Sequence, residues 1–182
     1  MRGGRDRAAA AAALLLLAGA ARAGVGETAE AAVRRAFPEA DRVEARDVIL
    51  TDDLVSRIER LARARVKERL VTFYTAWRGG AVAGYAVVHT HVVRTKPETL
   101  TIAFEPDGRI RSIAVLSFLE PPEYQPGERW LAQFRGKGPD DRLAVGQDVA
   151  AITGATLTAR GVAEESRWLL RALKVAVLEA KR

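Results

Sequence analysis

The chain of 182 residues contains no cysteine. A protein without cysteine has no disulfide bond, no thiolate zinc site, no cysteine-ligated iron–sulfur cluster and no C-x-x-C-H haem attachment. Packing alone must therefore stabilise the fold. If the protein moves electrons, its carrier belongs to none of these classes.

Long hydrophobic runs are also scarce. The run Ala8–Ala18 is shorter than the roughly 20 residues that span a bilayer. It follows three arginines and precedes the small-x-small pattern Ala21-Arg22-Ala23, which predicts a cleaved signal peptide over residues 1–23. The alternative is an uncleaved membrane anchor. No other stretch is apolar enough to cross a bilayer, so we expect an exported protein whose mature chain has no transmembrane segment.

The charge excess is modest once this segment is set aside. Cleavage after residue 23 removes four arginines and one aspartate, which lowers the net charge from +6 to +3. We find no basic stripe interleaved with aromatic residues, so nucleic acid is not an expected partner. Residues 24–182 show no repeat, linker or boundary and are read as a single domain.

Hydrophobic periodicity predicts an α+β fold with a central antiparallel sheet, N-terminal helices and a long C-terminal helix. Period-two alternation begins at Leu70, and the turns Gly79-Gly80 and Pro106-Asp107-Gly108 join successive strands. The expected elements are helices over 28–37, from Thr51 to about Val66, over 130–134 and over 157–180, and extended segments over 43–50, 70–77, 85–93, 99–104 and 110–118.

A short run of hydroxyl and small residues, Thr153-Gly154-Ala155-Thr156-Leu157-Thr158, precedes the last helical pattern. Gly154 permits close backbone approach, and Ala155 is too small to block a ligand. The first N–H groups of a helix lack intrahelical partners and favour an anion, so a phosphate held here would meet the Thr156 hydroxyl. We also expect Thr156 or Thr158 to be the N-cap of this helix. The alternative is that the run is only a turn followed by a helix cap.

This run resembles the Ser/Thr-Gly-Ala-Thr-x-Thr/Ser motif of the FMN-binding domain family. That family includes the peripheral flavin subunits of the Rnf and sodium-translocating NADH:quinone oxidoreductase complexes and many small exported flavoproteins. The segments 115–121 and 130–134 are similar to the strand, Glu/Pro loop and short helix that precede the motif, so the resemblance covers roughly residues 70–170.

The resemblance implies a cofactor and partners. It implies FMN joined through its phosphate to the second motif hydroxyl, here Thr156, by a dedicated flavin transferase. Other redox proteins or a membrane redox complex are the implied electron-transfer partners, and the implied location is periplasmic or peripheral to the outer face of the inner membrane. The implied cofactor-binding residues are Thr153, Gly154, Ala155, Thr156, Leu157, Thr158 and Glu120.

One position departs from the family pattern. An acidic residue usually lies three positions before the first hydroxyl, where this chain has Ala150, and Asp148 lies two residues too early. Covalent attachment and non-covalent binding of FMN therefore both remain open. Glu120 is expected to orient its loop or the flavin, and the alternative is an exposed loop carboxylate.

Three aromatic residues and two histidines are weaker candidates for a ligand or metal site. Tyr124, Trp130 and Phe134 could flank a flat ring system or belong to the core. His89 and His91 lie two residues apart on one strand face, a spacing that suits two metal ligands, but no third ligand is identifiable and no metal site is predicted.

We therefore expect an exported electron-carrier flavoprotein rather than a stand-alone catalyst, and we assign no catalytic residue. The alternative from another class is an exported, non-redox binding module for a small anionic ligand or a partner protein. A stand-alone flavin reductase is disfavoured because no nicotinamide-binding fingerprint is present.

Overall fold

The computed structural model describes residues 28–181, so the predicted signal peptide over residues 1–23 lies outside the described residues. The predicted fold class is confirmed: five consecutive strands form one antiparallel sheet, accompanied by N-terminal helices and a long C-terminal helix. No helix within 28–181 has the length and apolar character that a membrane span requires.

The sheet has the strand order β1-β2-β3-β4-β5, so each strand pairs with its neighbour in sequence. The strands are β1 (Arg42–Ile49), β2 (Leu70–Arg78), β3 (Ala81–Val92), β4 (Pro97–Phe104) and β5 (Ile110–Phe118). The predicted turn at Gly79-Gly80 joins β2 to β3, and both glycines adopt positive φ angles that L-residues rarely adopt. In the β3–β4 register, His89 lies opposite Leu100 and His91 lies opposite Glu98.

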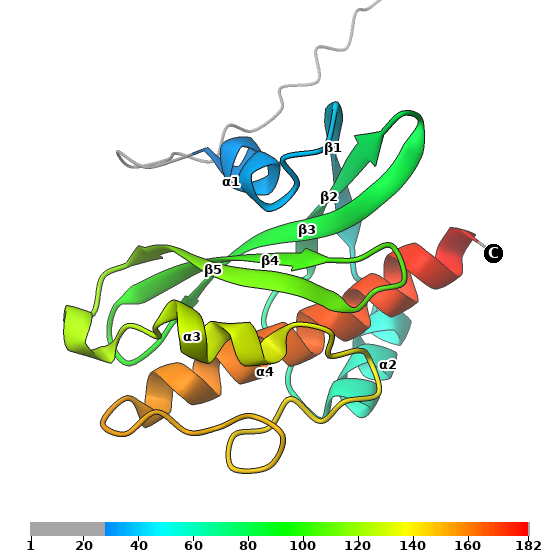
Figure 1. The fold of residues 1–182 in the computed structure, drawn as a ribbon. Helices are drawn as coiled ribbons and strands as arrows, with labels where there is room; N and C mark the ends of the chain where they lie inside the picture. The colour runs from blue at the N-terminus through cyan, green and yellow to red at the C-terminus, as the bar shows by residue number, and fades with distance from the viewer. Residues whose placement is uncertain (1–27, 182) are drawn as a thin grey trace, which may run out of the picture.

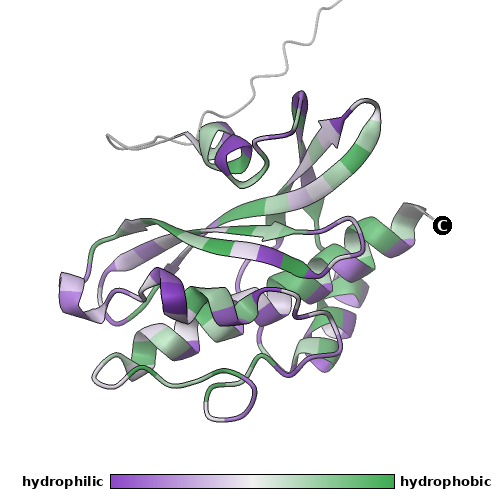
Figure 2. Ribbon diagram, in the orientation of Figure 1, coloured by the Kyte–Doolittle hydropathy of each residue, from purple (hydrophilic) through white to green (hydrophobic). Residues whose placement is uncertain are grey.

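The two faces of the sheet carry different helices (Figure 1). Helix α1 (Ala29–Ala36) covers one face through Val33 and a small cluster that includes Phe37 and Ala86. Helices α2 (Asp52–Ala62) and α4 (Thr156–Leu173) lie on the other face over the main core. Hydrophobic residues predominate along α4 where it crosses that face (Figure 2).

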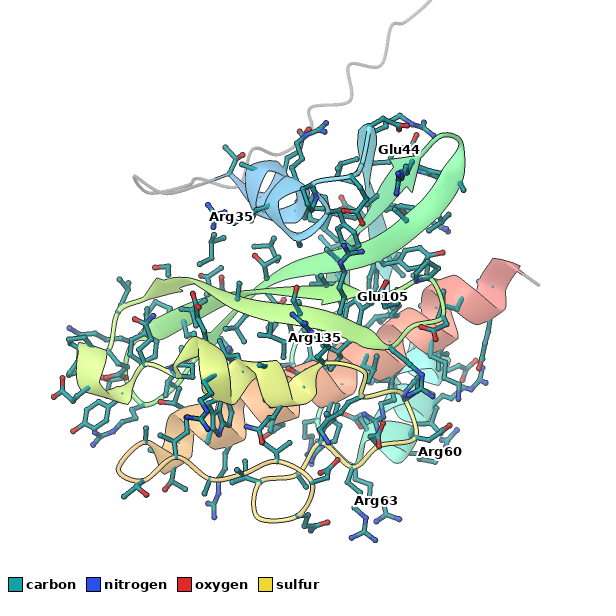
Figure 3. All side chains as sticks on the ribbon, viewed as in Figure 1. Arg35, Glu44, Arg60, Arg63, Glu105 and Arg135 are labelled. Carbon is teal, nitrogen blue, oxygen red and sulfur yellow. The ribbon has the colours of Figure 1, made fainter. Side chains whose placement is uncertain are left out.

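Helix α2 begins as its sequence predicts. The Thr51 Oγ accepts a hydrogen bond from the Leu54 N–H, and Asp52 and Asp53 lie in the first turn, where the helix dipole favours negative charge. The helix ends at Ala62 because Arg63 adopts a left-handed conformation, so the apolar stripe extrapolated to Val66 was too long. The charged face is solvated: Figure 3 shows Arg60 and Arg63 projecting away from the core.

The C-terminal helix is less regular than its hydrophobic stripe suggests. Regular α-helix ends at Leu173 and continues as one π-helical segment, η3 (Lys174–Leu178), and a 3₁₀ turn, η4 (Glu179–Lys181). The apolar side chains that precede and follow this change, including Leu169, Leu173 and Val177, remain buried in the main core. The apolar stripe correctly predicted which side chains are buried. It did not indicate the change from α-helical to π-helical hydrogen bonding.

Candidate functional site

The motif threonines lie at the N-terminus of α4 but do not cap it. Ala155 occupies the N-cap position and makes no side-chain cap hydrogen bond, so the expectation that Thr156 or Thr158 is the N-cap was wrong. Thr156 is the first helical residue and is exposed, as is Thr153, whereas Thr158 is only 1% exposed. Of the three motif hydroxyl residues, Thr153 and Thr156 are therefore the two that face solvent.

The backbone around these hydroxyls is open to a ligand. Gly154 has a φ of 81°, and a Cβ added there would have no neighbour within 4 Å. Leu157, the second helical residue, is 49% exposed, while the small side chain of Ala155 is buried. The first intrahelical bond runs from the Ala159 N–H to the Ala155 carbonyl at 3.0 Å, so the N–H groups of residues 156–158 precede the hydrogen-bonded ladder.

The loop before the motif is fastened to α3 (Glu128–Leu131) and η2 (Ala132–Phe134). The Trp130 Nε1 donates to the Ala150 carbonyl at 2.8 Å, and the Ala150 N–H donates to Gln133 Oε1 at 2.7 Å. The Trp130 ring also packs edge-on against Phe134, with centroids 5.3 Å apart. These contacts fix the backbone three residues before the first motif hydroxyl.

Replacing Trp130 with phenylalanine should loosen this loop. The change removes the indole donor but retains an aromatic ring beside Phe134, so we expect a loss of about 1 kcal/mol in the free energy of unfolding, the usual net value of one hydrogen bond. Backbone amides of residues 150–155 should exchange with solvent faster, as measured by hydrogen exchange with mass spectrometry.

The matched control is Trp77→Phe, because the Trp77 indole also donates at 2.8 Å, but to Glu44 on the distant β1 edge. That variant should leave exchange in residues 150–155 unchanged. Equal exchange rates for Trp130→Phe and the wild-type protein would contradict the fastening role of Trp130.

The Asp148 side chain stabilises the turn that precedes it in the chain. Its carboxylate accepts hydrogen bonds from the N–H groups of Leu143 at 2.9 Å and Ala144 at 2.8 Å, and it lies 3.4 Å from the Lys137 Nζ. Burial acts to raise the pKa of Asp148, but the bonds from Ala144 and Leu143 and the charge of Lys137 outweigh it, so the net pKa is lowered. With its carboxylate occupied in this way, Asp148 is poorly suited to replace the acidic residue that the family pattern places at position 150.

Glu120 is a buried structural carboxylate rather than an exposed one. Its Oε1 accepts hydrogen bonds from the backbone N–H groups of Arg94, Thr95 and Lys96 at 3.2, 2.7 and 2.9 Å. Hydrogen bonds from Thr95 and then Lys96 are the main causes that lower the pKa of Glu120. Glu120 thus fastens the loop after β5 to the β3–β4 turn, which agrees with the predicted loop-orienting role.

The three aromatic residues considered as ring contacts differ in how deeply they are buried. Phe134 is fully buried in the main core, as one of the two interpretations expected, and Trp130 packs partly buried against it. Tyr124 lies farther along the loop, in η1 (Pro122–Tyr124), with the Arg94 guanidinium 5.6 Å above its ring. A role for Trp130 or Tyr124 beside a ring-shaped ligand stays a prediction.

The two histidines point from β3 towards α4. The His89 Nε2 lies 3.0 Å from Glu165 Oε2, and this buried carboxylate also accepts hydrogen bonds from Lys67 Nζ at 2.6 Å and Trp168 Nε1 at 2.5 Å. Burial acts to raise the pKa of Glu165, but the bonds from His89, Lys67 and Trp168 lower it to about 2. Within residues 28–181, no group of three or more potential metal ligands is arranged around a common centre.

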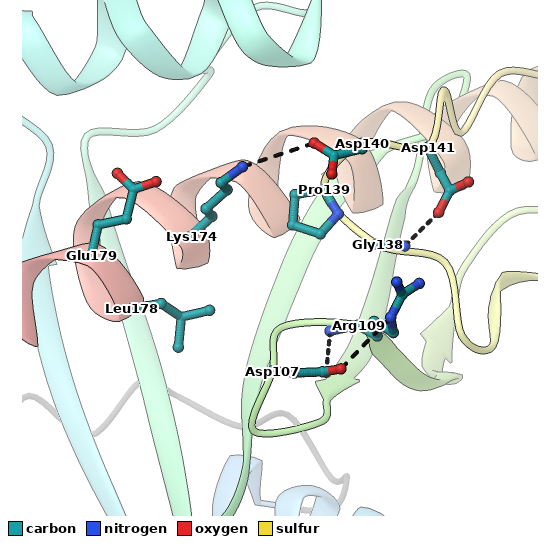
Figure 4. A pocket seen from close by; sticks show the side chains of 9 residues that line it. All are labelled: Asp107, Arg109, Gly138, Pro139, Asp140, Asp141, Lys174, Leu178 and Glu179. Carbon is teal, nitrogen blue, oxygen red and sulfur yellow. Dashed lines mark hydrogen bonds and ion pairs between the residues drawn. The ribbon is translucent and has the colours of Figure 1, made fainter. Parts of the chain in front are cut away.

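A charged pocket of about 330 Å³ lies at the opposite end of α4 (Figure 4). It is lined by the turn at Asp107 and Arg109, the 138–141 loop, and Lys174 and Glu179. Lys174 lies 18 residues after Thr156, roughly 27 Å along the helix at 1.5 Å per residue. This pocket is therefore not part of the motif site.

Residues 95–167 match the family model of the FMN-binding domain. The matched segment contains Glu120, Trp130 and the complete 153–158 motif, so the predicted resemblance is confirmed. This match of residues 95–167 to an FMN-binding domain implies FMN as the cofactor.

A solved structure supports the same fold. The crystal structure of Shewanella oneidensis NqrC is similar with a TM-score of 0.55 and 18% sequence identity, and the alignment covers 81% of this chain and 87% of that chain. At this identity the likeness shows the shared fold. No curated protein matches the chain.

Proposed function

We propose that this chain is an exported electron-transfer flavoprotein that carries FMN through a phosphoester to Thr156 and relays electrons between partner redox proteins. The observation that carries this proposal is the exposed Thr156 side chain on the first turn of α4, inside the segment that matches the FMN-binding domain. The wider family resemblance supports redox proteins or a membrane redox complex as partners.

The residues of the motif have separate tasks in this proposal. The N–H groups of residues 156–158 and the helix dipole favour the phosphate. Thr156 Oγ would lose its proton and bond to the FMN phosphorus while the leaving group of an activated flavin nucleotide departs on the transferase. Gly154, whose φ is 81° and whose Cα faces open space, lets the backbone approach the ligand closely. Thr153 offers a second exposed hydroxyl on the same turn.

The surrounding structure keeps this site in position. The flavin supplies the redox chemistry when it is bound, and the protein supplies placement and local electrostatics. Trp130 and Gln133 fix the loop that enters the motif, while Glu120 fixes the neighbouring turn at residues 94–96. A covalent link suits an exported protein because a cofactor lost outside the cytoplasm has no local pool to replace it.

The alternative of a non-redox binding module loses one of its supports. It assigned the motif threonines to helix capping, whereas the N-cap is Ala155 and no side chain caps α4. The hydroxyl of Thr156 is thus left without that structural role.

The proposal is tested by producing the full chain with and without an exported flavin transferase. With the transferase, the mature protein should begin near Gly24, show flavin absorbance and gain the mass of FMN less one water. Without it, the same chain should be colourless and unmodified. A folded, exported protein that gains neither mass nor flavin absorbance beside an active transferase contradicts the proposal.

A further inference from the structure

A buried acid–base pair lies beneath the first half of α4. His91 in β3 and Glu98 in β4 are cross-strand partners whose side chains are 3% and 0% exposed, and His91 Nε2 lies 3.2 Å from Glu98 Oε2. This is ion-pair distance without hydrogen-bond alignment: among the described residues, neither ring nitrogen of His91 and neither oxygen of Glu98 has a hydrogen-bond partner.

Such a pair is costly for the fold. Buried polar atoms are nearly always hydrogen-bonded, because desolvation without a partner is unfavourable. Apolar side chains of similar volume often stabilise a core at least as well as a buried ion pair. Buried polar atoms without hydrogen-bond partners are therefore candidates for a functional role.

The neighbouring histidine provides an internal comparison. His89 lies on the same face, with its ring centroid 6.2 Å from that of His91. Its Nε2 is engaged by Glu165, whose carboxylate is in turn held by Lys67 and Trp168. His89 therefore belongs to a satisfied structural network, whereas the His91–Glu98 pair has unused hydrogen-bonding capacity.

The pair lies beneath the same helix that carries the proposed attachment point. A Cβ added at Gly161 of α4 would be 2.8 Å from His91 Nε2, so the helix backbone passes directly over the imidazole. Gly161 follows Thr156 by five residues, roughly 7.5 Å along the helix axis. An interior helical glycine lowers helix stability relative to alanine, and the close approach of His91 explains its presence.

The charged groups on the elements packed against the pair gather around its neighbour His89. Those that face the pair or its histidine neighbour are His89 of β3, Lys67 and Glu68 before β2, and Glu164 and Glu165 of α4. Lys67 is already bound by Glu165 and lies 3.8 Å from Glu164. On β5, the cross-strand partner of Glu98 is the non-titratable Phe118.

We propose that the His91–Glu98 pair takes up one proton from solvent when the bound flavin is reduced, so that electron transfer through this protein is coupled to proton uptake. This inference rests on the proposed function. When FMN is bound, its two-electron reduction by a partner redox protein would bring one proton to the flavin and leave one added negative charge. A His91 ring nitrogen or a Glu98 carboxylate oxygen would accept a second proton at one of the atoms that lack hydrogen-bond partners. That proton would compensate the charge, because a nearby negative charge favours the protonated form of a buried group.

The experiment counts protons rather than turnover. The flavin-loaded full chain is reduced electrochemically near pH 8 in weak buffer containing a pH indicator. The wild-type protein should take up about one proton more per flavin than either His91→Gln or Glu98→Gln, and by linkage its midpoint potential should depend on pH about twice as steeply. The matched control, His89→Gln, should retain the wild-type proton count.

A double variant keeps the test valid if the single variants fail to fold. His91→Leu/Glu98→Met replaces the pair with apolar side chains and, in the flavin-free state, should be at least as stable to urea as the wild-type protein. Its flavin-loaded form should show the reduced proton count. A marked loss of stability would assign the pair to the fold and overturn the inference.

Different results would contradict the proposed function and this inference. A wild-type protein that acquires no flavin beside an active transferase overturns both the proposed function and this inference. A flavin-loaded protein whose His91→Gln, Glu98→Gln and double variants all take up as many protons as the wild type overturns the inference alone.

Discussion

Replacing Thr156 with valine is expected to abolish covalent flavin attachment while leaving the fold intact. The substitution keeps the branched shape of the side chain and removes the oxygen that the phosphoester needs. Because Thr156 is exposed and makes no cap bond, the free energy of unfolding should change by no more than about 0.5 kcal/mol. Intact-protein mass, flavin absorbance after denaturation and urea unfolding measure the three parts of this expectation.

Two variants control for changes at the same turn. Thr156→Ser retains a hydroxyl at the first helical position and should keep covalent flavin. Thr153→Val removes the other exposed motif hydroxyl and should also keep the covalent mass increase. Covalent flavin on Thr156→Val, or its loss only from Thr153→Val, would show that the attachment point is wrongly assigned.

Replacing Glu165 with glutamine should be the most destabilising isosteric change on α4. The carboxylate accepts bonds from His89, Lys67 and Trp168, and an amide would turn N–H groups towards some of these donors. Removing one partner of a buried charged network costs several kcal/mol, so we expect a loss of about 3 kcal/mol near pH 7. Urea unfolding followed by circular dichroism measures it.

The same carboxylate predicts a pH dependence. Its pKa is lowered from 4.5 to about 2 in the folded protein, so the unfolded chain binds its proton first as the pH falls. This contribution to stability is therefore complete above about pH 4.5 and is lost progressively between about pH 4.5 and 2. The difference in unfolding free energy between wild type and Glu165→Gln should shrink over that interval.

The adjacent Glu164 provides the matched control. Its side chain is 38% exposed and lies 3.8 Å from Lys67, an arrangement of the kind that contributes 0–1 kcal/mol. Glu164→Gln should change stability by less than about 1 kcal/mol at neutral pH. Equal losses for the two variants would mean that the buried network around Glu165 does not contribute as argued.

Much of the fold could be predicted because its signals are local. The strands β2 to β5, the turn at Gly79-Gly80 and the Thr51 cap each depend on a few neighbouring positions, and all appear as expected. The termini of helices were less predictable. Arg63 ends α2 in a left-handed conformation, and α4 changes its hydrogen-bond period after Leu173.

The candidate site was predictable in its position and not in its geometry. The 153–158 run was identifiable by residue type, but its sequence suggested threonine caps where Ala155 occupies the N-cap. Nothing in the spacing indicated that Asp148 is bound by the N–H groups of residues 143 and 144, or that the Trp130 indole holds Ala150. Such contacts depend on how the loops fold, and the periodicity of the sequence gives no information about them.

By itself, the sequence determined the α+β class, the strand succession, the absence of cysteine-based chemistry and the motif at the start of α4. Tertiary structure alone decided that Thr158 is buried while Thr156 is exposed, and that His91 meets Glu98 under Gly161. The physical reason is that periodicity records which face of an element is apolar. Which polar side chains meet on that face depends on strand register and helix docking, and these are settled only when the whole core packs.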